Sequence, residues 1–173
     1  MTEQNFSFRP VQESDLQQIC RFPQSAQELF FMFPRAAYPL TVEQLRAAVA
    51  ARSESTVMLQ NGLIIAFANF YLCQPGEVCA IGNVIVAAPA RGQGAGRALI
   101  EAMARIAFTK YAVQRVEVSC FNQNTAGLLF YPKLGFTPLS IEERLDSHAE
   151  KVALIHLALT RPHWLENQSA ESR

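Results

Sequence analysis

The sequence predicts an α+β fold in three layers (α/β three-layer): one central mixed, mostly antiparallel sheet of about seven strands, with helices on both faces. Half of the 173 residues are hydrophobic, which is enough for the core of one domain. Runs typical of strands are interspersed with stretches in which apolar residues recur every three or four positions. Two local signals add to this pattern: an Asn61-Gly62 pair typical of a hairpin, and an apolar run, Val84–Val86, that leads through glycines into a helical pattern.

The N-terminal part begins with a strand and continues with helices. Phe6–Arg9 alternates like a short strand that Pro10 closes. Ser14 is a candidate helix cap, and Thr41 with Gln44 predicts a capping box at the start of a later helix. The remaining predicted elements are a helix at 25–34, strands at 56–60, 63–72 and 78–86, a helix ending near 108, a strand at 115–120, a helix around 124–132, a short strand at 136–139 and a final strand at 152–159.

The connections between these elements set the topology. Hairpins at Asn61-Gly62 and Pro75-Gly76 require antiparallel neighbours. The strand, helix and strand around the glycine-rich loop should form a parallel, right-handed crossover. We expect a single domain over residues 1–165 and a frayed polar tail over residues 166–173.

The glycine-rich loop, Arg91–Gly96, is the strongest local signal for a binding site. A loop between a buried strand and a helix can bind phosphate, because glycines admit an anion close to the backbone and the first helical N–H groups have no internal partners. A P-loop would need Lys-Ser or Lys-Thr, which is absent here. A dinucleotide fold would need Gly-x-Gly-x-x-Gly and a later acidic residue, and neither is present.

Two motifs resemble one family. Arg91-Gly92-Gln93-Gly94-Ala95-Gly96 matches the pattern Arg/Gln-x-x-Gly-x-Gly/Ala, and residues 124–136 supply an asparagine, a tyrosine seven residues later and Leu-Gly-Phe. In these motifs the chain resembles the Gcn5-related N-acetyltransferases (GNAT family), over roughly residues 56–139. Pro132 stands where that family more often has glutamate, and proline should end or kink the helix there.

The resemblance implies a cofactor and a reaction. It implies transfer of an acetyl group from acetyl-coenzyme A (acetyl-CoA) to a primary amine of a small molecule, by direct attack in a ternary complex. Val84, Ile85 and Val86 would lie beside the pantetheine arm, and Arg91 would flank the pyrophosphate as a cation. Asn124 would bond to the pantetheine or the neighbouring loop, or cap its helix. The backbone around the pyrophosphate would come from Gly92, Gln93, Gly94, Ala95, Gly96 and Arg97.

The same resemblance implies catalytic residues. Tyr131 would be the general acid that protonates the leaving thiolate, since a phenol is a donor at neutral pH; the alternative is a core aromatic residue. Asn83 would orient substrate or water, or else it is a hydrogen-bonded polar residue of its strand. The sequence identifies no general base, and Glu117 fits the exposed member of an alternating pair.

The acceptor would be held by aromatic and amide side chains with few carboxylates, at Phe33, Tyr38, Asn69 and Asn122. This composition favours a small, moderately apolar amine or an amino acid over a polycation such as a polyamine. An ordinary core role is the alternative for Phe33. A protein N-terminus or a lysine stays open as acceptor.

Composition excludes several other classes. Fifteen basic and fifteen acidic residues give zero net charge, which argues against nucleic-acid binding. The four cysteines lack metal-binding spacing, so no metal is expected, and the sequence has neither a secretion signal nor a membrane span. We expect a cytoplasmic protein; a homodimer is compatible with the sequence. The alternatives are a non-catalytic acyl-CoA-binding regulatory module and a protein that binds ATP or NAD.

Overall fold

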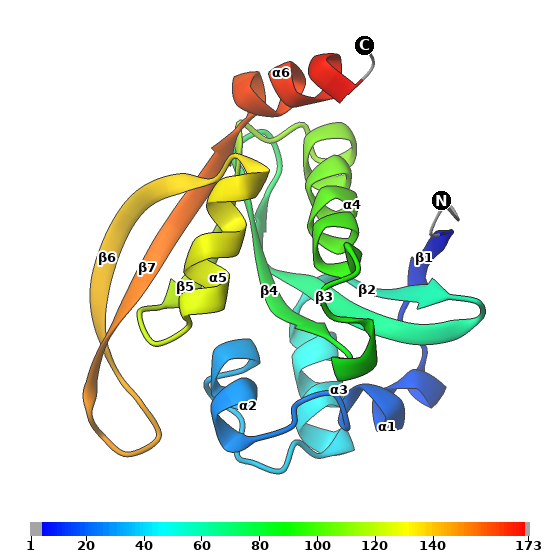
Figure 1. Cartoon of the computed structure of the whole chain (residues 1–173), viewed down its shortest axis with the longest axis vertical. Coiled ribbons are helices and arrows are strands. Elements are labelled where there is room, and N and C mark those ends of the chain that lie inside the picture. The colour runs from blue at the N-terminus through cyan, green and yellow to red at the C-terminus, as the bar shows by residue number, and fades with distance from the viewer. Residues whose placement is uncertain (1–4, 172–173) are drawn as a thin grey trace. The chain divides into compact units, whose positions relative to one another are not determined.

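The computed structural model describes residues 5–171. Seven strands hydrogen-bond in the order β1-β2-β3-β4-β5-β7-β6 and form one mixed sheet (Figure 1). The strands are β1 (Phe6–Pro10), β2 (Ser53–Gln60), β3 (Leu63–Gln74), β4 (Val78–Val86), β5 (Arg115–Phe121), β6 (Thr137–Leu145) and β7 (Lys151–Thr160). The α-helices of the described chain are α1 (Leu16–Ile19), α2 (Ala26–Met32), α3 (Val42–Ala51), α4 (Ala95–Lys110), α5 (Thr125–Phe130) and α6 (Arg161–Glu171). The predicted α+β class with a seven-stranded mixed sheet is confirmed.

The chain divides into two compact units, and β3, β4 and α4 each contribute to both. The first unit comprises the chain up to Tyr71 together with Gly82–Met103. Its strands β1, β2 and β3 form an antiparallel meander, and the predicted Asn61-Gly62 turn has both residues at positive φ (51° and 78°). Its core consists of Leu16, Ile19, Phe22, Leu29, Met32, Leu40, Leu45, Val57, Ile64, Phe67 and Ile85.

The caps of the first helices differ in part from the prediction. Ser14 does not cap a helix, because a short 3₁₀ turn starts one residue earlier and Asp15 accepts the Gln12 N–H at 2.7 Å. Thr41 caps α3 as expected, accepting the Gln44 N–H at 3.3 Å. The predicted return bond, from the Thr41 backbone N–H to the Gln44 side chain, is wrong. The Gln44 side chain instead bonds to the backbone N–H and the carbonyl of Ala37. The first helix start is thus capped by a different local residue, whereas the Gln44 side chain bonds to the preceding loop instead of the Thr41 backbone N–H.

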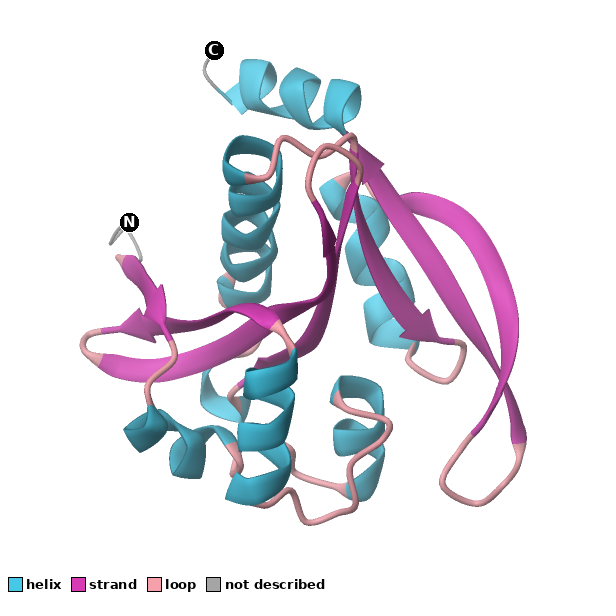
Figure 2. Ribbon diagram, turned by 180° about the vertical axis from the view of Figure 1, so that it is seen from behind, coloured by secondary structure: helices cyan, strands magenta, loops and turns pink. Residues whose placement is uncertain are grey.

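The second unit comprises Leu72–Ile81 and the chain from Ala104 onward. Within it, Val78–Ile81 of β4 runs parallel to Arg115–Val118 of β5, as the strand–helix–strand pattern predicts. Strand β7 pairs antiparallel with both β5 and β6. Figure 2 shows β6 and β7 as two long neighbouring strands.

Two predictions about the C-terminal part are wrong. The strand predicted at 136–139 is longer than expected. It is the nine-residue β6, which pairs with β7 at eight positions. The tail predicted to be frayed from residue 166 instead continues helix α6 to residue 171, and residues 172–173 lie outside the described chain. Trp164 stacks on Phe108 at 4.7 Å between ring centroids, and the Arg161 guanidinium donates to the carbonyls of Val113 and Phe108. These long-range contacts fix a helix whose own sequence is polar.

Among residues 5–171, no helix has both the length and the apolar character that a bilayer span requires. The same part of the chain holds no group of three or more His, Cys, Asp or Glu side chains arranged to bind a metal ion.

Candidate functional site

The end of strand β4 and the loop that follows form the first candidate site region, within the first unit. Ile85 is 7% exposed and belongs to the core, while Val84 and Val86 point to the other face and are half-buried. The strand therefore anchors itself through Ile85 and leaves Val84 and Val86 accessible at its other face. This alternation fits the predicted role beside an extended pantetheine arm.

The glycine-rich loop adopts the backbone conformation that its composition predicts. Gly92 and Gly94 have φ of 73° and 82°, in the left-handed region that glycine occupies without steric cost. A Cβ at Gly92 would meet nothing within 4 Å, so the loop leaves open space beside its backbone. Helix α4 begins at Ala95, and Ala98 donates to the Gly94 carbonyl at 3.0 Å. The amides before Ala98 lie in the first turn, where N–H groups have no intrahelical acceptor, and the helix dipole favours an anion there. The loop thus fits a pyrophosphate.

Side chains of the loop mostly bond locally. Gln93 donates to the Pro89 carbonyl at 2.9 Å, and Arg97 pairs with Glu101 one helical turn later at 3.1 Å. Both side chains are exposed. Backbone groups are therefore the part of this loop that a phosphate would meet first.

Arg91 is already paired. Its two terminal nitrogens donate to both Glu28 oxygens at 2.7 and 3.1 Å, and its Nε donates to the Val86 carbonyl at 3.0 Å. The guanidinium hydrogen bonds lower the pKa of Glu28 below its ordinary value, and the carboxylate in turn raises the pKa of Arg91. Arg91 thus ties the end of β4 to α2. Its predicted role as a cation beside pyrophosphate stays a prediction, and the Glu28 carboxylate competes with it.

The second motif lies in the second unit and starts with a helix cap. Asn124 Oδ1 accepts the Gly127 N–H at 3.0 Å, which confirms the capping interpretation of Asn124. A Cβ at Gly127 would lie 2.7 Å from both Asn124 Nδ2 and Cys120 Sγ, so only glycine fits there. Helix α5 ends at Phe130, and a 3₁₀ turn with Pro132 follows, as proline requires.

Tyr131 is enclosed by aromatic rings. Its side chain is 8% exposed, with the rings of Phe130 and Phe136 packed edge-on at centroid distances of 5.2 and 5.8 Å. Burial raises the pKa of the Tyr131 phenol well above its usual range, and the neighbouring Cys120 raises it further. Tyr131 is therefore a neutral proton donor over the whole physiological pH range. The geometry is compatible with both of the roles predicted for it.

A family model decides between the interpretations of these two motifs. The model of the acetyltransferase (GNAT) family matches residues 16–136, which contain both motifs and more than half of the chain. The chain belongs to the acetyltransferase (GNAT) family. It is accordingly an N-acetyltransferase, and acetyl-CoA is the acetyl donor of its family.

Solved structures with the same fold include several N-acetyltransferases. The ribosomal-protein-S18-alanine N-acetyltransferase of Escherichia coli is 22% identical, with 90% of this chain and 94% of that chain covered and a TM-score of 0.70. An N-acetyltransferase of Staphylococcus aureus Mu50 is 19% identical, with 90% and 98% covered and a TM-score of 0.73. The spermidine N-acetyltransferase of Vibrio cholerae, solved with CoA and spermine, is 15% identical, with 92% and 98% covered and a TM-score of 0.77. At these identities the likeness establishes the fold.

In this GNAT protein, the residues predicted around the acceptor are placed in different settings. Asn69 and Asn83 lie together in the first unit, where Asn69 Nδ2 donates to Asn83 Oδ1 at 2.9 Å. Tyr38 is 50% exposed in the segment between α2 and α3, and Phe33 packs partly on the core. Asn122 belongs to the second unit, where its Oδ1 accepts the Ala153 N–H at 2.9 Å and extends the pairing of β5 with β7.

Asn83 stands out because of its backbone. It is 2% exposed and has φ of 50° within strand β4, a left-handed conformation that is uncommon outside glycine. Besides accepting from Asn69, it donates from Nδ2 to the Met32 carbonyl at 3.1 Å. Both ends of its amide are hydrogen-bonded within the protein, which agrees with the alternative of a hydrogen-bonded polar strand residue; its contact with substrate or water stays a prediction.

Sequence reasoning missed Arg52 and a polar chain on the sheet. Arg52 donates to Asn69 Oδ1 at 3.1 Å, yet no motif or period marks it. In the second unit, Ser119 Oγ lies 2.8 Å from His156 Nδ1, and Glu142 lies 3.4 Å from His156 Nε2. These three residues join β5, β7 and β6, and His156 occupies β7 as a strand residue, as predicted. Only strand register brings them together.

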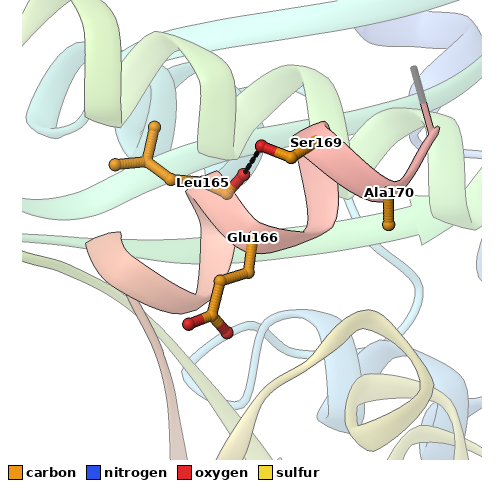
Figure 3. A pocket seen from close by; sticks show the side chains of 4 residues that line it. All are labelled: Leu165, Glu166, Ser169 and Ala170. Atoms are coloured by element: carbon orange, nitrogen blue, oxygen red, sulfur yellow. Dashed lines mark hydrogen bonds between the residues drawn. The ribbon is translucent and has the colours of Figure 1, made fainter. Parts of the chain in front are cut away.

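A pocket on helix α6 holds none of these residues. Figure 3 shows its lining side chains, Leu165, Glu166, Ser169 and Ala170, all from one helix. The Ser169 hydroxyl donates to the Leu165 carbonyl at 3.0 Å within the helix. The lining offers no arrangement of chemical groups for acetyl transfer.

Proposed function

We propose that this protein transfers the acetyl group of acetyl-CoA to a primary amine of a small molecule, by direct attack in a ternary complex. The observation that carries this proposal is the loop Arg91–Gly96, whose two left-handed glycines, at Gly92 and Gly94, directly precede the first turn of α4. Family membership supports the choice of acetyl-CoA as donor. Because no Lys-Ser or Lys-Thr pair follows the loop, ATP is a poor alternative ligand.

The reaction needs few protein groups. The neutral amine nitrogen attacks the thioester carbonyl carbon, the C–S bond breaks, and the products are an N-acetylated amine and coenzyme A thiol. Holding both reactants side by side removes much of the entropic barrier. A backbone N–H near Val86 is our candidate donor to the thioester oxygen, which gains negative charge during attack.

Tyr131 is our candidate general acid. Its phenol would give a proton to the leaving thiolate, and the proton that the amine nitrogen loses would pass to water and restore the phenol. Since burial raises the pKa of this phenol, the acid form persists at neutral pH. Asn124 adds a second proposed contact, to the pantetheine, in addition to its capping bond.

Calorimetric titration of the purified protein with acetyl-CoA, with ATP and NAD as controls, is the first test. Selective binding in the micromolar range is expected, followed by thiol release when an amine is added. If the folded protein binds none of the three, the proposal is wrong and the loop is an ordinary connection between strand and helix. Binding without thiol release from any amine would instead indicate a non-catalytic acyl-CoA-binding module.

A further inference from the structure

A chain of polar side chains runs through the interior of the first unit. Arg52 Nη1 donates to Asn69 Oδ1 at 3.1 Å, Asn69 Nδ2 donates to Asn83 Oδ1 at 2.9 Å, and Asn83 Nδ2 donates to the Met32 carbonyl at 3.1 Å. Because a carbonyl can only accept, the direction of each bond in this chain is fixed from Met32 outward. Asn69 and Asn83 are 0% and 2% exposed, so the amide that holds the Arg52 guanidinium is itself held in place by a second buried amide.

Aromatic rings fix the same guanidinium from two directions. The Cζ of Arg52 lies 5.6 Å from the centroid of Phe33 and 5.7 Å from that of Tyr71, within range of cation–π attraction. Gly82 on β4 leaves the necessary space, since a Cβ there would lie 2.7 Å from Arg52 Nη1 and 2.8 Å from Tyr71 Cδ1. The arginine head group is thus held in one place by two rings, an amide and a strand backbone.

This fixed cation has no acidic partner. In the part of the chain that the structure describes, no carboxylate lies within ion-pair distance of Arg52, whereas Arg9, Arg46, Arg91, Arg97, Arg115 and Arg144 each have one. Burial lowers the pKa of Arg52, while the neighbouring Tyr71 raises it and the cation Arg35 lowers it. A guanidinium has five N–H donors, and within residues 5–171 one of those of Arg52 is used in a side-chain hydrogen bond.

We propose that Arg52 binds a carboxylate of the acceptor, so that the acceptor is a small molecule with both a primary amine and a carboxylate, such as an amino acid. This inference rests on the proposed function. An anion on Arg52 would replace the hydration that burial removes, and a planar guanidinium matches a carboxylate in two parallel hydrogen bonds.

The position of the chain along β4 supports this assignment. Asn83 precedes Val86 by three residues, a rise of ~10 Å along a strand. Arg52 Nη1 lies against Gly82, the residue before Asn83, so a carboxylate held at Arg52 would lie beside the strand that leads to the glycine loop. A polyamine would instead meet the like charges of Arg52 and Arg35.

The test compares acceptors that differ only in the carboxylate. Thiol release is measured with a set of L-amino acids, with the matching amino-acid carboxamides and with spermidine, at saturating acetyl-CoA. We expect the free acids to be acetylated with kcat/KM at least ~10-fold above the carboxamides, as a charged hydrogen-bonded pair provides. Equal or better use of carboxamides or spermidine, or no turnover with any free acid, overturns the proposal.

The variant Arg52→Gln tests whether the preference for free acids comes from Arg52. Glutamine removes the charge and keeps a polar side chain, so we expect the fold to persist, KM for free acids to rise ~10–100-fold and carboxamide kinetics to stay unchanged. Arg105→Gln, on an exposed part of α4, is the matched control and should change neither. Equal losses with both acceptor classes would assign Arg52 a structural role only. Calorimetry with acetyl-CoA separates the two proposals: Arg52→Gln should bind it normally, whereas failure of the wild-type protein to bind it rejects the proposed function itself.

Gly82→Ala provides a second, independent variant. Its Cβ would displace the guanidinium and Tyr71 without removing the charge. The same selective rise in KM for free acids is expected, with a thermal melting curve to verify folding. Unchanged KM for the free acids in folded Gly82→Ala would contradict the claim that this fixed position binds the carboxylate.

Discussion

The two motif regions present opposite parts of the polypeptide. In the loop Arg91–Gly96, the Gln93 side chain is exposed and bonds locally, Arg91 pairs with Glu28, and positive φ at Gly92 and Gly94 opens the backbone to a ligand. In the segment from Asn124 to Phe136, the Asn124 side chain caps the start of α5. The reactive group that this segment offers is the buried phenol of Tyr131. In our proposal the first region binds the coenzyme through its backbone and the second acts through a side-chain functional group, so substitutions should separate the two effects.

Gly94→Val should have the largest effect. A β-branched residue at φ of 82° is strained and obstructs the backbone that would meet pyrophosphate. We expect acetyl-CoA affinity to fall on the order of 100-fold by calorimetry, equivalent to about 3 kcal/mol. Gly62→Val in the hairpin has similar positive φ and open surroundings, so it controls for strain and should bind normally. A comparable loss in both variants would show that strain alone is measured.

Tyr131→Phe should affect turnover and leave binding intact. Removing the proton donor is expected to lower kcat about 100-fold, with acetyl-CoA affinity unchanged because the ring packing on Phe130 and Phe136 is retained. Burial raises the pKa of the phenol, so its acid form is retained as pH rises. The wild-type kcat should therefore show no decline from Tyr131 between pH 7 and 10. Full activity of the variant would remove Tyr131 from the mechanism.

Asn124→Ala and Asn124→Asp distinguish capping from coenzyme binding. Alanine leaves the Gly127 N–H without its acceptor and should lower the free energy of unfolding by about 1 kcal/mol, measured by denaturant titration. Aspartate keeps the accepting oxygen and should retain that stability. If the amide also donates to the coenzyme, affinity for acetyl-CoA falls in both variants. Normal affinity in Asn124→Asp would limit this residue to its cap.

Glu28→Gln should give the smallest effect, in the direction of tighter binding. It releases the Arg91 guanidinium, so acetyl-CoA affinity should rise about 2–5-fold at low salt and less at high salt. Loss of this partly exposed pair should cost stability by less than about 1 kcal/mol. Glu13→Gln, which frees Arg46 from a similar surface pair, is the control. Equal affinity in all three proteins would mean that Arg91 serves only to join β4 to α2.

The pKa of Glu28 also gives this pair a pH dependence. Arg91 lowers that pKa, so the folded state holds the proton less tightly than the unfolded chain does. The stabilisation is therefore complete above the ordinary glutamate range near pH 4.5 and is lost as pH falls below it. Glu28→Gln should remove this acid-side loss from the curve of unfolding free energy against pH.

Local patterns were sufficient for the order of the elements and for both motifs. Glycine spacing, the Asn61-Gly62 turn and the proline at 132 act on the backbone within a few residues, so the sequence reveals them. Strand β6 and helix α6 were underestimated because their stability comes from β7 and from Phe108, which are distant in sequence. Polar composition alone suggests loops at both places.

The candidate site was predictable where it depends on backbone conformation. The sequence marks Asn83 as a polar residue in an apolar strand and Asn69 as an amide near the acceptor, but their hydrogen bond spans 14 residues of sequence and the next link reaches Met32, 51 residues away. Arg52 has no periodic or motif signal, since its importance comes from rings and amides that converge on it. The pairing of Arg91 with Glu28 is equally long-range.

The conformation and the hydrogen bonds of Asn83 restrict this position in different ways. A left-handed φ is tolerated by glycine, asparagine and aspartate. The carbonyl of Met32 can accept only from a donor, and Asn69 Nδ2 requires an acceptor. Glycine offers neither group, and an ionised aspartate would set oxygen against oxygen at Met32. Among the residues that suit the backbone here, asparagine alone offers both the donor and the acceptor, so the amides of Asn83 and Asn69 together link the last turn of α2 to the side chain of Arg52.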